Sequence, residues 1–226
     1  MTMMIHFVDK WADAQRACNA IKTKTLLGLD LEIENGATSL LQIAVSTREV
    51  YIFDVTALGR PLFDASCLLP ILCDPRITKL CYDCRGDAET LFHKHGAKVY
   101  GLYDLQIVCT WLFQSPSDPH LKGIAHAARR ALPAAKAFAA DKARMKRCFR
   151  AGENMFARPL SSAALQYCAD DAIVLMQMHA ALSRRVDAED VLVVSSIRAN
   201  RHIFRCGCGS SCSGTNNGMH IVDFPP

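Results

Sequence analysis

Three closely spaced segments rich in β-forming residues place the strongest limit on how this chain folds. They cover residues 25–33, 39–46 and 50–55, and the breaks between them, at 34–36 and 47–49, are short. Breaks of this length join neighbouring antiparallel strands, because a parallel connection needs a dozen or more residues. The sequence therefore predicts an antiparallel meander at the start of a sheet.

Strands and helices alternate after the meander. Residues 62–73 favour a helix, 77–82 a short buried strand, 87–95 a helix that ends at Gly96, and 99–102 a further strand. From there to about residue 181, apolar residues recur at helical spacing. This order predicts an α/β domain whose mixed sheet has an antiparallel meander followed by parallel strands, with helices flanking it.

The two ends of the chain differ from its middle. Residues 9–22 have apolar side chains at spacings of three and four, which predicts a helix with one buried face. Residues 205–218 are mainly glycine, serine, cysteine and asparagine, with almost nothing to bury. We therefore expect an N-terminal helix packed on the domain (1–24), a central domain (25–185) and a C-terminal extension (186–226) that is largely disordered from residue 205.

Composition narrows the classes of protein to which the chain can belong. Half of its residues are hydrophobic and 21% are charged, the usual balance for a globular protein. No apolar run reaches the roughly 18 residues that cross a bilayer, and the N-terminus lacks a signal-peptide pattern. The eleven cysteines are scattered rather than arranged as the framework of a small domain. We expect an intracellular protein, cytoplasmic or nuclear, with reduced cysteines and no membrane partner.

Two carboxylates occupy a strand that is otherwise apolar. In Gly28-Leu29-Asp30-Leu31-Glu32 both acids project from one face of the sheet while the leucines face the other. Two like charges at a buried position need protonation, basic partners or a divalent cation. A solvated strand end explains the same pattern, so this feature alone leaves a metal site and a structural role open.

Two further segments carry acids at positions that favour a shared site. Tyr167 and Asp171 are four residues apart in a helical segment and lie on one face, whereas Asp170 points about a hundred degrees away. Asp87 falls in the first turn of a helix, where a carboxylate also complements the helix dipole. Alone, the residues of the helical segment fit an exposed acid pair with a core tyrosine better than a site, and a helix cap explains Asp87 as well as a site does.

Taken together, the acids form a set of oxygen ligands that suits Mg²⁺ or Mn²⁺ rather than zinc. These candidate metal ligands are Asp30, Glu32, Asp87 and Asp171. Two such ions about 3.5–4 Å apart clamp a phosphodiester while water attacks it in line. The predicted chemistry is therefore phosphodiester hydrolysis with two metal ions.

The same motifs resemble those of the DEDD superfamily of 3′→5′ exonucleases, in the tyrosine-bearing branch that includes ribonuclease D. The resemblance extends over residues 25–182. Asp30-Leu31-Glu32 is similar to the first exonuclease motif, Asp87 occupies the acid of the second, and Tyr167-x-x-x-Asp171 is similar to the third. The resemblance implies a ribonuclease H-like fold and a catalytic set made of Asp30, Glu32, Asp87, Tyr167 and Asp171.

The second motif points to one group within the branch. Its Tyr-Asp-Cys-Arg-Gly-Asp sequence, from Tyr82 to Asp87, is similar to that of the Egalitarian-like exonuclease domains. Asp83 stands where many members have asparagine, and Phe156 where tryptophan is common. Ribonuclease D also carries a helical nucleic-acid-binding domain, for which the forty or so residues after the nuclease are too few and too polar.

The resemblance implies a mechanism. Asp30, Glu32 and Asp171 hold the ion that activates water, Asp30 also contacts a second ion, and Asp87 supports the cluster directly or through water. Tyr167 orients the attacking water. The expected reaction releases nucleoside 5′-monophosphates from a single-stranded 3′ end, RNA in preference to DNA. The alternative is an RNA-binding adaptor that keeps the fold with little or no turnover.

A strongly basic segment precedes the third motif. Residues 129–150 contain eight basic residues and one acid, Asp141. This segment forms either a surface that follows a polyanion beside the active site or a solvated helix face. The residues predicted to bind nucleic acid are Arg129, Arg130, Lys142, Arg144, Lys146 and Arg147.

Cysteines and histidines near the C-terminus offer a second possible metal site. Zinc would require Cys206, Cys208 and Cys212 together with His202 or His220. Their spacing matches none of the common zinc modules, and a tail with reactive thiols is the simpler interpretation.

Overall fold

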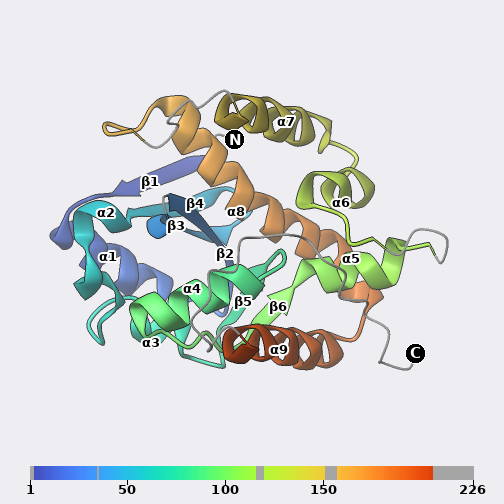
Figure 1. Cartoon of the computed structure of the whole chain (residues 1–226), viewed down its shortest axis with the longest axis horizontal. Helices are drawn as coiled ribbons and strands as arrows, with labels where there is room; N and C mark the ends of the chain where they lie inside the picture. The colour runs from blue at the N-terminus through green and yellow to red at the C-terminus, as the bar shows by residue number, and fades with distance from the viewer. Residues whose placement is uncertain (1–2, 35, 116–119, 151–156, 206–226) are drawn as a thin grey trace.

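The computed structural model describes residues 3–34, 36–115, 120–150 and 157–205, and a six-stranded sheet lies at its centre (Figure 1). The strands are β1 (Met4–Val8), β2 (Leu26–Glu34), β3 (Ala37–Ser46), β4 (Glu49–Asp54), β5 (Thr78–Cys81) and β6 (Leu102–Asp104). Their order across the sheet is β1-β4-β3-β2-β5-β6. β2, β3 and β4 form the predicted antiparallel meander, while β5 is parallel to β2 and β6 is parallel to β5. The predicted mixed α/β fold is confirmed.

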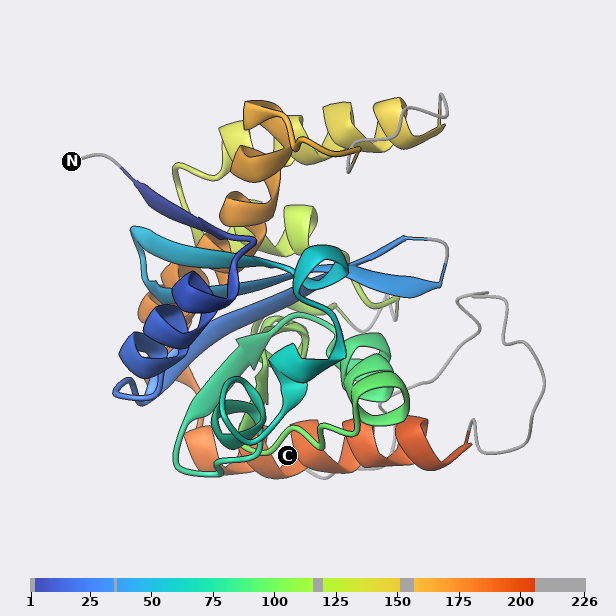
Figure 2. The same cartoon turned by 90° about the vertical axis from the view of Figure 1, so that its left-hand side faces the viewer.

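Helices cover both faces of this sheet, as Figure 2 shows. They are α1 (Trp11–Ile21), α2 (Val55–Leu58), α3 (Leu69–Leu72), α4 (Arg85–His95), α5 (Leu105–Phe113), α6 (Ile124–Ala131), α7 (Lys136–Arg150), α8 (Ser162–Leu182) and α9 (Ala188–Arg205), with short 3₁₀ turns η1 (Arg60–Phe63) and η2 (Ser183–Arg185). One apolar core lies between the sheet and α5, α6 and α8. The second lies on the opposite face, under α1, α3, α4 and α9.

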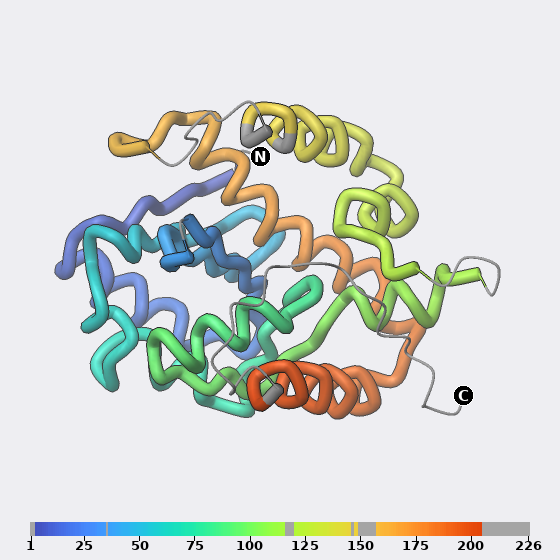
Figure 3. The backbone as a smooth tube through the Cα atoms, viewed as in Figure 1, coloured from blue at the N-terminus to red at the C-terminus, as the bar shows by residue number. Residues whose placement is uncertain are grey.

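Alternation along β2 divides its side chains between these two cores. Leu27, Leu29 and Leu31 are buried in the core under α1 and α4, so the even-numbered positions face α8. Figure 3 shows α8 running diagonally across the sheet, where it contacts β2, β3 and β4. The acids of β2 therefore point toward α8, as the sequence pattern predicts.

Two segments between β4 and β6 differ from the predictions. The single helix expected over 62–73 is broken into η1 and α3, because Asp64 adopts an extended conformation that ends η1. The strand expected over 99–102 starts only at Leu102, since Gly101 has a positive φ of 67°. A Cβ at Gly101 would lie 2.5 Å from the carbonyl oxygen of Ile77, so this turn requires glycine.

The N-terminal and C-terminal segments contribute more to the fold than the sequence predicted. The expected helix at 9–22 is present as α1, but β1 precedes it and pairs in parallel with β4. Beyond residue 185, α9 packs on α4 and β6. Disorder was predicted from residue 205 onward. Residues from 206 onward lie outside the described part of the chain, so this prediction is not tested.

One pair of cysteines departs from the expectation of reduced thiols. Cys18 of α1 and Cys67 form a disulfide, with their Cα atoms 5.4 Å apart. Both are buried on the same face of the sheet although 49 residues separate them in sequence, so their spacing gives no sign of the contact. Among the described residues, no helix is both long and apolar enough to cross a membrane.

Candidate active site

The site begins where α8 lies against the backbone of β2. A Cβ on Gly28 would stand 2.5 Å from the carbonyl oxygen of Ala172, so only glycine permits this approach. Ala172 directly follows Asp171, and Gly28 is two residues before Asp30 on the same face of β2. The close contact therefore places the carboxylate of Asp171 beside those of β2.

Three of the four predicted metal ligands converge. Ligand oxygens of Asp30, Glu32 and Asp171 all lie within 4.8 Å of one another, and these three residues are called the acidic cluster below. Asp171 is only 2% exposed. Asp87, in the first turn of α4, is outside this 4.8 Å group but close enough for its charge to act on Asp30 and Glu32. The structure thus brings together side chains that are more than 130 residues apart in sequence.

Lys142 reaches into this cluster from α7. Its Nζ donates to the hydroxyl of Tyr167 at 2.8 Å and to Oδ2 of Asp171 at 2.5 Å, and it also lies 4.5 Å from the centre of the tyrosine ring. Tyr167 and Asp171 share one face of α8, as their spacing predicts, whereas Asp170 accepts a hydrogen bond from Gln166. Lys142 therefore belongs to the site and not to an exposed cationic surface.

The cluster holds more negative charge than its surroundings neutralise. Burial, reinforced by Asp171, raises the pKa of Glu32 to about 8. The pKa of Asp30 is raised well above its usual value by burial and then by Asp171, Glu32 and Asp87. Burial lowers the pKa of Lys142, but its carboxylate and phenol partners outweigh that and raise it above the usual value. One ammonium thus faces several carboxylates that favour protonation unless further cations bind.

The donor atoms fit a hard divalent cation. Oδ1 of Asp171 is buried and accepts no hydrogen bond from any described residue, although buried carboxylate oxygens are almost always paired. Carboxylates of Asp30 and Glu32 lie within the same 4.8 Å group. An all-oxygen set of this kind suits Mg²⁺ or Mn²⁺, while zinc sites favour sulfur and nitrogen.

A second ionic network lies beneath Asp87. Arg198 of α9 donates to Oδ2 of Asp104 at 2.7 Å and to Oδ1 of Asp83 at 3.2 Å, and Asp83 also pairs with Arg85 at 2.6 Å. Burial, followed by the charges of Asp83 and Asp104, raises the pKa of Asp87 to about 7. Asp83, which replaces the asparagine common in the resembled family, adopts a left-handed conformation with φ of 60°, which asparagine also tolerates.

The other predicted nucleic-acid-binding residues are divided between α6 and α7. Arg129 and Arg130 are exposed on α6, and the exposed Arg144 and Arg147 lie on α7. Arg144 forms a surface pair with Asp141 at 3.5 Å. The backbone of Lys146 is helical, and its side chain lies outside the described atoms.

The possible zinc ligands are only partly described. His202 lies in α9 and pairs with Glu89 of α4 at 2.8 Å. Cys206, Cys208, Cys212 and His220 lie outside the described residues, as does Phe156. The zinc interpretation therefore stays a prediction.

Two contributions to the site could not be read from the sequence. The sequence pattern groups Lys142 with the basic residues of 129–150, because no local pattern links it to Tyr167, 25 residues later in the chain. Arg158, before α8, forms a two-pronged pair with Asp54 at the end of β4, at 2.7 and 2.8 Å. This pair anchors the entry to α8 at the sheet.

Comparison with known proteins identifies relatives by sequence. Human piRNA biogenesis protein EXD1 is 29% identical over 171 residues, covering 72% of this chain and 33% of that protein. Ribonuclease D of Pseudomonas paraeruginosa is 26% identical over 192 residues, covering 82% of this chain and 46% of that protein. The chain thus spans less than half the length of either relative.

A solved structure confirms the fold. RNase D of Trypanosoma brucei in complex with RNA U12 superposes with a TM-score of 0.74 at 22% identity, covering 89% of this chain and 71% of that one. The family model described as 3′-5′ exonuclease matches residues 5–187, which include the acidic cluster, Asp87 and Tyr167. The chain therefore belongs to the 3′-5′ exonuclease domain family.

Proposed function

We propose that this chain is a metal-dependent 3′→5′ exonuclease that hydrolyses the terminal phosphodiester bond of single-stranded RNA and releases nucleoside 5′-monophosphates. The observation that carries the proposal is the convergence of Asp30, Glu32 and Asp171 within 4.8 Å, with one oxygen of Asp171 left without a hydrogen-bond donor among the described residues. The preference for RNA is supported by similarity to ribonuclease D, one form of which has been crystallised with RNA.

Asp30, Glu32 and Asp171 would hold Mg²⁺ or Mn²⁺, and Asp87 would support them from α4. When bound, two such ions lower the pKa of a coordinated water and stabilise charge on the phosphate. The protein supplies the geometry, because the Gly28 contact and the Arg158 pair fix α8 against the sheet. Since cations promote water ionisation in such a site, no histidine base is required.

Tyr167 and Lys142 have roles that follow from their contacts. The phenol of Tyr167 is on the same helical face as Asp171 and is held by the ammonium of Lys142 at 2.8 Å. Burial raises its pKa further above the usual value, so it stays protonated and can hold a water or a phosphate oxygen by a hydrogen bond. A pocket of about 100 Å³ opens beside these residues, and Lys142, Tyr167 and Asp171 all line it.

The test uses a 5′-labelled RNA strand with Mg²⁺ or Mn²⁺, and the adjacent acids Asp171 and Asp170 provide a matched pair of variants. Asp171→Asn should abolish the ladder of shortened products, and Asp170→Asn should retain it, because Asp170 bonds to Gln166 outside the cluster. Asp30→Asn should be as inactive as Asp171→Asn. Equal ladders from all of these proteins would refute the assignment.

One observation favours an RNA-binding adaptor as the second candidate. The ammonium of Lys142 already neutralises part of the acidic cluster through Asp171, and an ion pair of this kind needs no catalytic role. An adaptor would bind RNA equally well in chelator and in metal, and no metal would elicit cleavage. Release of 5′-monophosphates by the unmodified chain would exclude this alternative.

A further inference from the structure

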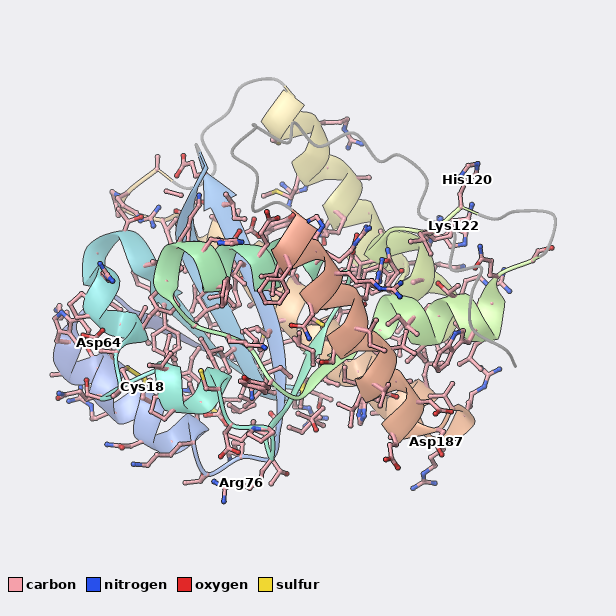
Figure 4. The ribbon with its side chains drawn as sticks, turned by 60° about the horizontal axis from the view of Figure 1, so that its bottom comes forward. Cys18, Asp64, Arg76, His120, Lys122 and Asp187 are labelled. Carbon is pink, nitrogen blue, oxygen red and sulfur yellow. A yellow bond between two sulfur atoms is a disulfide. The ribbon has the colours of Figure 1, made fainter. Side chains whose placement is uncertain are left out.

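A second pocket lies on the same side of the sheet as α8, between α5 and α6. Its volume is about 190 Å³. The side chains important for its chemistry are those of Tyr82, Phe113, His120, Lys122, His126 and Arg130. Figure 4 labels His120 and Lys122, which lie near each other on the side of the molecule where α5 and α6 are drawn. The pocket is separate from the acidic cluster, none of whose members lines it.

The pocket concentrates positive charge around one aromatic ring. The guanidinium of Arg130 lies 5.3 Å and that of Arg185 5.5 Å from the centre of the Phe113 ring. No aspartate or glutamate is among the described residues that line the pocket. The positive charge of these side chains attracts an anion into the pocket.

Backbone contacts connect this pocket to the second exonuclease motif. The hydroxyl of Tyr82 donates to the carbonyl oxygen of Lys122 at 2.6 Å, and Nε2 of Gln106 donates to the same carbonyl at 3.4 Å. These bonds fix the loop that carries Lys122 against the end of β5. The backbone of Lys122, at one side of the pocket, is therefore held beside Tyr82.

The strand register places the pocket one strand away from the acidic cluster. β2 and β5 are parallel, with Gly28 opposite Leu80, so the chain that leaves β5 at Tyr82 heads toward the same end of the sheet as Asp30. Leu80 faces the α8 side of the sheet, and Tyr82, two residues later, packs against the same core. A strand whose 3′ end lies at the acids can thus pass over Tyr82 toward Arg130.

We propose that this pocket is a subsite for an internal phosphate of the substrate strand, on the 5′ side of the scissile bond. The proposal rests on the proposed function, because it assumes that the 3′ end lies at the acidic cluster. Arg130 and Lys122 supply the donors, since a guanidinium can hold two oxygens of one phosphate and an ammonium adds a point charge. A phosphate contact grips the backbone without reading the base.

The experiment measures binding of a labelled oligouridylate in chelator, where cleavage cannot occur, by fluorescence anisotropy at several salt concentrations. Arg130→Gln is compared with Arg201→Gln, which removes the same charge from an exposed position of α9 that does not line the pocket. Arg130→Gln should weaken binding about threefold to tenfold and reduce the salt slope by about 0.7. Arg201→Gln should change neither quantity.

Further arms separate the competing outcomes. Equal losses in the two variants would indicate diffuse attraction and overturn the proposal. Unchanged binding in both would show that Arg130 does not contact the strand and would overturn it as well. Uridine 5′-monophosphate is added as a competitor, because a pocket that takes free nucleotides would bind it. If Arg130→Gln abolished binding of the mononucleotide but left binding of the oligouridylate unchanged, the strand subsite would be refuted. Should Arg130→Gln lower the melting temperature, His126→Asn, at the same pocket, repeats the comparison.

The proposed function is tested apart from the pocket. A dinucleotide has no phosphate on the 5′ side of the scissile bond, so its hydrolysis should be unchanged in Arg130→Gln. If Arg130→Gln weakened binding but neither the unmodified protein nor the variants hydrolysed RNA, the subsite would be supported and the nuclease function refuted. If hydrolysis were normal and both variants bound RNA equally well, the nuclease function would be supported and the subsite refuted.

Discussion

The carbonyl oxygen of Ala172 lies directly over Gly28, where a Cβ would stand 2.5 Å from it. Gly28→Ala should therefore force α8 away from β2 and destabilise the protein, by about 1–3 kcal/mol as for other overpacked sites. Because Asp171 moves with α8, the affinity for Mn²⁺ should fall as well. Urea denaturation and calorimetric titration with Mn²⁺ measure the two effects.

Gly86 is the matched control for this substitution. It lies in α4, and a Cβ added there would meet nothing within 4 Å, so Gly86→Ala should stabilise the helix by up to about 1 kcal/mol. If both variants were equally stable, the close contact at Gly28 would not hold α8 in place.

Lys142→Met should make the protein more dependent on metal. The variant leaves the carboxylate of Asp171, which is 2% exposed, without its charged partner, and removing one member of a buried pair costs about 3–5 kcal/mol. Since a divalent cation can replace the missing charge, Mn²⁺ should raise the melting temperature more in this variant than in the unmodified protein.

The comparison for Lys142→Met is Arg144→Met on the same helix. Arg144 is exposed and its pair with Asp141 is on the surface, so its loss should change stability by less than about 1 kcal/mol. Identical responses of the two variants to Mn²⁺ would mean that Lys142 does not neutralise the acidic cluster.

The stability of the metal-free protein should fall as the pH rises. Burial and neighbouring carboxylates raise the pKa of Glu32 to about 8 and that of Asp87 to about 7. In the unfolded chain these groups titrate near about 4, so between about pH 5 and pH 8 the folded state binds more protons than the unfolded state. The free energy of unfolding in chelator should therefore decrease across this range.

Denaturation in chelator, repeated with Glu32→Gln, checks the pH prediction. The amide does not titrate, so the variant should lose part of the slope. Mn²⁺ should restore stability at the alkaline end, because cations favour the ionised carboxylates. A variant with the same slope as the unmodified protein would show that Glu32 does not contribute.

Arg198→Met should destabilise the sheet edge at β6. It removes the guanidinium 2.7 Å from Asp104, which is fully buried, so the expected loss is about 3–5 kcal/mol. Arg201→Met, at an exposed position of the same helix, should have almost no effect. Urea denaturation distinguishes the two, and equal midpoints would contradict a structural role for Arg198.

The sequence predicted those parts of the fold that depend on local patterns. The meander follows from alternation and short breaks, and α4 ends at Gly96, which has the left-handed φ of 68° expected of a helix stop. β1 was missed because five residues at a sheet edge have a partly exposed pattern without clear alternation. The disulfide was missed because it joins distant segments.

The candidate site was predictable to a similar extent. Helical and strand periodicities place Tyr167 with Asp171 and Asp30 with Glu32, and the resemblance to a known family joins the two pairs. No periodicity connects Lys142 to these acids, because its position depends on how α7 packs on α8. The assignment of catalytic and metal-binding roles stays a prediction until the variants are measured.

The match to the family ends at residue 187, and α9 begins at Ala188. A shortened protein designed on the matched segment would retain every acid of the acidic cluster and lose Arg198, leaving Asp104 with no guanidinium inside the core. Such a fragment would resemble an inactive enzyme for reasons unrelated to its chemistry. Boundaries for expression or for domain exchange should therefore include α9.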